Sequence, residues 1–217
     1  MIISHAHRFV FFSNPKTGSE SLRALLEPYN EVPVRPWRET TLAQPFYPHM
    51  PPREALPVFR ANGWDWEGYR RITCVRNPYP RLVSLYRMIA EVDGVWKLRA
   101  RLGLGVPSFA RWLAATRPEG RGGGGRSHQR WRRYGTWSAG AWTHDAHGRR
   151  LVTDTLRLER LADELPEVLA DLGLPRDLSL PHVNARPATD WRGWYDGATH
   201  GLVARRYAWD LRNFHYS

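Results

Sequence analysis

Two apolar segments, each followed by a turn and a helical repeat, organise the first half of the chain. Residues 8–13 (RFVFFS) are apolar on both faces and end at Asn14, before a proline, which is typical of a buried parallel strand. In residues 19–29 (SESLRALLEPY) the leucines fall on one helical face. Residues 71–75 (RITCV) repeat the strand pattern, and residues 80–92 (PRLVSLYRMIAEV) repeat the helical one. The pattern predicts two strand–turn–helix units.

The remaining apolar patterns extend this alternation to the end of the chain. They predict a short helix within 51–60, a helix over 109–115, a strand over 151–158, a helix over 160–174 that ends at Gly173, and an amphipathic helix over 201–214. Strands that alternate with helices favour an α/β fold with a mostly parallel central sheet flanked by helices. At 217 residues, we expect a single domain over 1–217.

The first candidate site is the turn between the first strand and its helix. Backbone N–H groups at a helix N-terminus carry partial positive charge and bind phosphate-like anions, and a glycine lets the backbone approach closely. The lysine precedes the glycine, so this is not an ATPase loop of the Walker type. An ordinary turn with a solvent-exposed lysine is the alternative. The candidate anion-binding residues are Lys16, Thr17, Gly18, Ser19, Glu20 and Ser21.

The second candidate site follows the strand at 71–75. Arg76 comes directly after it, at the edge where open α/β sheets bind ligands, and Ser84 comes from the next helix. A guanidinium and a hydroxyl suit a dianionic phosphate. The alternative is that Arg76 and Arg81 are surface residues and that Ser84 is a small packing residue.

Together the two motifs resemble the sulfotransferases that use 3′-phosphoadenosine 5′-phosphosulfate (PAPS). In that family a PK-x-G-[ST] loop holds the 5′-phosphosulfate and an R-x₇-S pair holds the 3′-phosphate; here these are PKTGSES and the pair Arg76 and Ser84. The segment VRNPYPRLVSLY is closest to the bacterial and carbohydrate-type (family 2-like) branch. Softer similarity covers 151–165, 180–195 and 204–216. Glu20 departs from the family pattern, which commonly has a small or hydroxyl residue there.

The resemblance implies a fold, a reaction and further residues. We expect a three-layer P-loop-like fold and transfer of the sulfuryl group from PAPS to an acceptor hydroxyl on a carbohydrate, with adenosine 3′,5′-bisphosphate as product and no metal. Lys16 and His49 are the implied catalytic residues, with His49 as the general base. Glu54 and Glu27 are weaker candidates for the base, and Arg186 is a further phosphate contact. A hydroxyl on an aromatic natural product is the alternative acceptor.

Composition limits the partners without choosing among them. The formal net charge of +11 favours anionic partners, and all of the basic residues except Lys16 and Lys97 are arginines. The Gly- and Arg-rich segment 117–133 is the expected flexible loop beside the acceptor; a nucleic-acid binder that uses this segment, or a P-loop-like kinase, is the alternative class. Nucleic acid is the less favoured partner.

The single cysteine and the histidines bear on location and on metals. Cys74 alone can form neither an internal disulfide nor a cysteine zinc cluster, and the apolar run at the N-terminus is too short for a signal or a membrane span. We therefore expect a cytoplasmic protein with no membrane partner. His144 and His147 flank an aspartate, but we interpret the segment as a surface turn rather than as a metal site.

Overall fold

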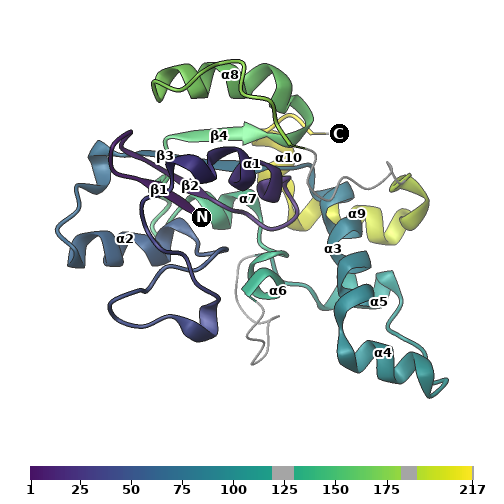
Figure 1. The fold of residues 1–217 in the computed structure, drawn as a ribbon. Coiled ribbons are helices and arrows are strands. Elements are labelled where there is room, and N and C mark those ends of the chain that lie inside the picture. The colour runs from purple at the N-terminus through teal and green to yellow at the C-terminus, as the bar shows by residue number, and fades with distance from the viewer. Residues whose placement is uncertain (119–129, 182–189, 217) are drawn as a thin grey trace.

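A mixed sheet of four strands forms the centre of the molecule (Figure 1). The computed structural model describes residues 1–118, 130–181 and 190–216. The strands lie in the order β1-β2-β3-β4, with bounds Ile2–Ser4, Phe9–Phe12, Arg70–Val75 and Asp154–Arg157. β1 pairs antiparallel with β2, whereas β2, β3 and β4 are parallel. The prediction of a mostly parallel sheet is confirmed.

Helices cover both faces of this sheet, and β2 shows why its sequence is apolar throughout. Phe9 and Phe11 point into a cluster formed with α1 (Ser19–Leu26) and α8 (Leu161–Asp171). Val10 and Phe12 point to the opposite face, into a cluster with α2 (Pro52–Ala61), Trp137 and α7 (Ala139–Thr143). Because successive strand residues alternate between faces, every side chain of a strand that is covered on both faces is buried and is therefore apolar.

A third cluster lies beside the sheet and is dominated by aromatic residues. It joins α3 (Pro78–Val92) to α5 (Phe109–Ala115) and α9 (Gly197–Arg206). The remaining elements are α4 (Gly94–Arg101), α6 (Arg130–Tyr134), α10 (Ala208–Asn213) and the short 3₁₀ turns Glu27–Tyr29, Trp37–Glu39, Trp66–Gly68, Leu158–Arg160 and Arg192–Trp194.

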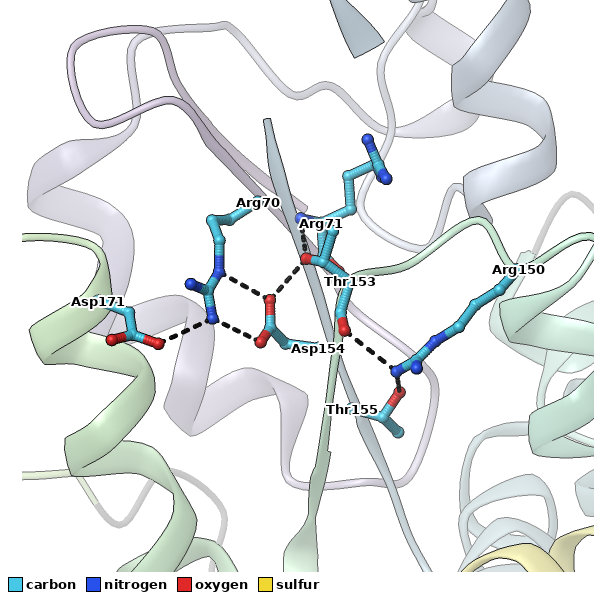
Figure 2. A network of polar contacts seen from close by, with 7 residues as sticks. All are labelled: Arg70, Arg71, Arg150, Thr153, Asp154, Thr155 and Asp171. Atoms are coloured by element: carbon cyan, nitrogen blue, oxygen red, sulfur yellow. Dashed lines mark hydrogen bonds and ion pairs between the residues drawn. The ribbon is translucent and has the colours of Figure 1, made fainter. Parts of the chain in front are cut away.

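An ion-pair network fixes the amino ends of the parallel strands β3 and β4 (Figure 2). The Arg70 guanidinium donates two hydrogen bonds to the Asp154 carboxylate, at 3.0 and 2.7 Å, and a third to Asp171 at the end of α8, at 3.0 Å. Thr153 accepts a hydrogen bond from the Arg71 backbone N–H at 2.8 Å, and Arg150 donates to the Thr153 carbonyl at 3.1 Å. This network ties β3 to β4 and to the end of α8 at one end of the sheet.

The structure differs from two predicted elements and contains one strand that the pattern does not predict. The last strand is shorter than 151–158, because Leu151 and Val152 turn into the cluster around α2 before pairing begins. The single helix predicted over 201–214 is two helices, α9 and α10, interrupted at Tyr207. The strand β1 was not predicted, since three residues carry too little pattern. The turn at His144 is confirmed by an antiparallel bridge to Arg150.

Candidate functional site

The loop between β2 and α1 is held by its own backbone. Asn14 and Thr17 are fully buried, and the Thr17 hydroxyl donates to the Asn14 carbonyl at 2.8 Å. Lys16 has a φ of 66°, in the left-handed region that residues with a side chain rarely occupy, and Gly18 follows with a φ of 74°. A non-glycine residue in this region is held there by its surroundings at a cost of about 1 to 2 kcal/mol. The surrounding contacts therefore hold the loop in one defined backbone conformation.

Gly18 lies where a larger residue would not fit. A Cβ atom built on it would lie 2.6 Å from Cδ1 of Leu158, which comes just after β4. Gly18 is also the N-cap of α1 and supplies no side-chain cap, so the first N–H groups of the helix are not satisfied by that residue. Glu20, in the first turn, is exposed, and its charge lies at the rim of the loop.

The two sequence motifs meet at the carboxyl ends of β2 and β3. Arg76 follows β3 directly, and its Nη1 atom donates to the Lys16 carbonyl oxygen at 3.4 Å. The Lys16 ammonium lies 3.6 Å from Sδ of Met88 on α3. Ser84 lies one turn before Met88, so both project from the same helix face. Lys16 therefore lies between Arg76 and the face of α3 that carries Ser84.

A carboxylate that the sequence did not single out also lies at this edge. Glu159 follows β4, and its Oε1 accepts a hydrogen bond from the Asn77 backbone N–H at 2.8 Å. Burial lowers the pKa of Arg76, and the Glu159 charge acts in the opposite direction. Parallel pairing of β3 with β4 brings Arg76 and Glu159 to the same edge of the sheet. The two residues are far apart in the sequence, so their proximity cannot be predicted from local patterns.

His49 is tied to the same loop and is neutral. Its Nδ1 lies 2.8 Å from the Ser13 carbonyl oxygen, which only accepts, so Nδ1 carries the proton and Nε2 keeps its lone pair. Burial lowers the pKa of His49 to about 4, and the positive charges of the Met1 amino group and Arg23 act in the same direction. The imidazole is thus in the tautomer that a base requires. Its hydrogen-bond partner, Ser13, is three residues before Lys16 in the sequence.

The two carboxylates considered as alternative bases, Glu54 and Glu27, differ from His49 in their contacts. Glu54 accepts hydrogen bonds from the hydroxyls of both Tyr47 and Tyr134, the latter at 2.7 Å, so both of its oxygens are engaged. Glu27 is exposed at the end of α1. Glu27 also lines the cavity described below, whereas Glu54 does not.

A cavity of about 450 Å³ opens between Met1, the end of α1 and residues 33–39. Met1 lines it and connects it to the loop, because the Met1 nitrogen donates to Ser13 Oγ at 2.8 Å and to the Pro48 carbonyl at 2.9 Å. Its other lining residues are Arg23, Glu27, Asn30, Pro33, Val34, Arg35, Pro36 and Glu39. A second cavity, of about 480 Å³, is lined by Trp191, Arg192, Tyr195, Asp196, Gly197 and His200. Neither lining includes Lys16 or Arg76.

Some predicted features fall outside the described residues. Arg186 does so, as does most of the segment 117–133.

Arg81, for which a surface position was the alternative, is instead fully buried and donates to the Trp137 carbonyl at 2.6 Å. Among the described residues there is no group of three metal-ligating side chains, and no described helix is long and apolar enough to cross a bilayer.

Comparison with known proteins gives one distant structural neighbour. No protein-family model matches the sequence, and no curated protein matches it. A crystal structure of a sulfotransferase from Alicyclobacillus acidocaldarius is similar, with 18% identity over 97% of this chain and 83% of that chain, at a TM-score of 0.36. A similarity at this level carries no argument about function, which has to be drawn from the site itself.

Proposed function

We propose that this chain is a PAPS-dependent O-sulfotransferase. The observation that carries the proposal is the contact between the Arg76 guanidinium and the Lys16 carbonyl, 3.4 Å apart. This contact brings the loop at the N-terminus of α1 and the Arg76 guanidinium to the same edge of the sheet, at the carboxyl ends of the parallel strands. This is the edge where α/β folds bind ligands, and both groups can bind anions. PAPS carries two anionic groups on one nucleotide, and this edge offers two places for them.

The chemistry of the loop fits a phosphosulfate. Gly18 has no side chain to cover the first N–H groups of α1, and Leu158 occupies the place that a Cβ would take, 2.6 Å from its Cδ1. The Asn14 carboxamide is buried and has no hydrogen-bond partner among the described residues, so a polar donor and acceptor remain in the loop. In this proposal residues 16–21 hold the 5′-phosphosulfate, and Arg76 with Ser84 holds the 3′-phosphate. Arg186 is proposed as an additional phosphate contact.

The proposed reaction is an in-line transfer. The acceptor oxygen forms a bond to sulfur while the bond from sulfur to the 5′-phosphate oxygen breaks, and adenosine 3′,5′-bisphosphate leaves. The acceptor proton passes to Nε2 of His49, the nitrogen that the Ser13 contact leaves unprotonated. Lys16 and the first N–H groups of α1 stabilise the negative charge that develops on the bridging and sulfuryl oxygens.

The acceptor is proposed to be a carbohydrate hydroxyl. The cavity of about 450 Å³ at Met1 is lined by two arginines, two glutamates and an asparagine, side chains that suit several hydroxyl groups better than an aromatic ring. An aromatic acceptor would be expected to meet an apolar lining. The overall positive charge is compatible with an acceptor that also carries anionic groups.

A ligand comparison tests the class of protein. A ligand of the native state raises the unfolding midpoint, so adenosine 3′,5′-bisphosphate should raise it, whereas ATP with Mg²⁺ and a single-stranded oligonucleotide should not. A larger shift with ATP and Mg²⁺ would favour the kinase alternative, and a larger, salt-sensitive shift with the oligonucleotide would favour the nucleic-acid binder.

Matched variants test the residue roles. Lys16→Ala should lower kcat about 100-fold or more with little change in the Kd of adenosine 3′,5′-bisphosphate, and Arg76→Ala should mainly raise that Kd. Lys97→Ala, which removes the other lysine, and Arg111→Ala, which removes an exposed arginine, serve as controls. Unchanged turnover in Lys16→Ala would show that its catalytic role is wrong.

A further inference from the structure

The segment that follows α3 exposes an unusual amount of apolar surface. Within residues 92–106, which we call the α4 tip, Val95, Leu98, Leu102 and Leu104 are 66%, 55%, 63% and 60% exposed. Val92 and Val106 are exposed as well, so six of the large exposed apolar side chains of the described chain lie in one short segment. Figure 1 shows α4 at the periphery of the molecule, at the end away from α8. Concentrated apolar exposure of this kind marks an interaction surface.

The tip is held in a defined conformation. Arg99 donates from Nε to the Gly105 carbonyl at 3.1 Å and from Nη2 to the Leu104 carbonyl at 3.2 Å, which closes the turn after α4. Gly103 and Gly105 have φ values of 68° and 64°, as this turn requires. At the base, the Tyr86 hydroxyl donates to the Pro107 carbonyl at 2.7 Å. The leucines are therefore presented on an ordered turn.

The charges of the tip have one sign. Lys97, Arg99 and Arg101 are exposed, and the sequence contains no acidic residue from 94 to 118. Asp93, at the start of α4, is buried, caps the helix through the Trp96 N–H at 2.7 Å and pairs with Arg132. Its charge is thus neutralised within the protein. Glu91, directly before the tip, is exposed, and the exposed charges within the tip itself are all positive.

We propose that the α4 tip docks on an anionic lipid surface. Exposed leucines between lysine and arginine are the composition that enters the boundary between headgroups and acyl chains, with cations at the level of the phosphates. A second copy of the chain fits less well, because a two-fold contact through this tip would bring like charges together. The proposal concerns docking at a surface, and it replaces the sequence expectation of no membrane partner, which rested on the absence of a spanning segment.

Co-sedimentation with lipid vesicles tests the proposal on the full chain. Vesicles of phosphatidylcholine with about a third phosphatidylglycerol should bind the protein at least about tenfold more strongly than pure phosphatidylcholine, and salt should weaken the binding. Leu98→Ser with Leu102→Ser should reduce binding about tenfold, and so should Lys97→Gln with Arg101→Gln. Leu42→Ser, at a fully exposed leucine elsewhere, and Arg38→Gln with Arg60→Gln are the matched controls.

Each result bears directly on the proposal. Thermal unfolding of every variant establishes that it is folded before binding is compared. Equal binding to neutral and anionic vesicles, no binding to either, or binding that survives both tip variants would overturn the proposal. A concentration-dependent dimer, detected by sedimentation and lost in the leucine variant, would assign the tip to contact between copies instead. None of these outcomes bears on the proposed sulfotransfer, because the variants leave residues 13–21, His49 and Arg76 unchanged.

Discussion

Replacement of Gly18 by alanine separates two effects that act on the anion loop. The first is conformational, because Gly18 has a φ of 74°, which an alanine adopts at a cost. The second is steric, because the new Cβ would lie 2.6 Å from Cδ1 of Leu158. Gly63 provides the control: its φ is 69°, and a Cβ atom there would meet nothing within 4 Å.

The two replacements should differ by a measurable amount. A left-handed conformation costs alanine about 1 to 2 kcal/mol, and the reduced freedom of the unfolded chain returns about 0.4 to 1 kcal/mol, so Gly63→Ala should lower the free energy of unfolding by about 1 kcal/mol. Gly18→Ala adds overlap with the flexible end of a leucine, at the lower end of the roughly 1 to 3 kcal/mol typical of overpacking. We expect a total of about 2 to 3 kcal/mol.

Urea unfolding of both variants measures this difference, and titration with adenosine 3′,5′-bisphosphate measures its effect on binding. Adding Leu158→Ala to Gly18→Ala should recover about 1 kcal/mol of coupling, because the smaller side chain removes the overlap. Only Gly18→Ala should weaken nucleotide binding. If Gly18→Ala and Gly63→Ala prove equally stable and bind the nucleotide equally well, the contact with Leu158 does not constrain the loop and the reasoning is wrong.

Three further predictions concern groups outside the loop backbone. Arg81→Ala should lower the free energy of unfolding in urea by about 3 to 5 kcal/mol, because it removes the positive charge that acts on the buried Asp210, whose pKa burial already raises; Arg81→Met fills the space but also lacks the charge, so a cost near zero for Arg81→Met would contradict an electrostatic role. The pKa of His49 falls from 6.5 to about 4 on folding, so the stability that neutral His49 contributes is present above pH 6.5 and is lost as the pH falls toward 4. Between pH 7.5 and pH 5 the wild type should therefore lose about 2 kcal/mol more than His49→Gln, as measured by urea unfolding at each pH, and parallel pH profiles would refute the shift. Asp154→Asn should cost about 1 kcal/mol at low salt and less at high salt, because Arg70 and Asp154 form a two-bond pair that is partly exposed; a cost independent of salt would point to packing instead.

The sequence allowed the central strands and the candidate loop to be predicted because their signals are local. A strand buried on both faces must be apolar at every position, as residues 9–12 are, and a proline after it marks where the strand stops. The short helix predicted within 51–60 and the helix over 109–115 are confirmed for the same reason, since the apolar spacing lies within each segment.

Other features depend on contacts between distant segments. Arg81 lies in a helix with no local sign of burial, and only the packing of Trp137 and Tyr207 around it encloses the guanidinium. Glu159 reaches the edge near Arg76 through the parallel pairing of β3 and β4. At the break between α9 and α10, the Tyr207 hydroxyl donates to the distant Thr136 carbonyl at 2.6 Å. The apolar pattern of one segment does not reveal which distant residues will contact it.

Backbone hydrogen bonds hold the loop of the candidate site, and the Lys16 side chain contacts a thioether. The carbonyls of Ser13 and Asn14 accept hydrogen bonds from His49 and Thr17 at 2.8 Å each, which fixes the path of the chain before Lys16. The Lys16 ammonium, by contrast, lies 3.6 Å from a thioether sulfur, which is a weak acceptor. An anionic oxygen would compete readily for that ammonium, because charge-assisted hydrogen bonds are about twice as strong as neutral ones. In the proposed reaction, the loop would supply fixed backbone dipoles and the Lys16 ammonium to stabilise the transition state.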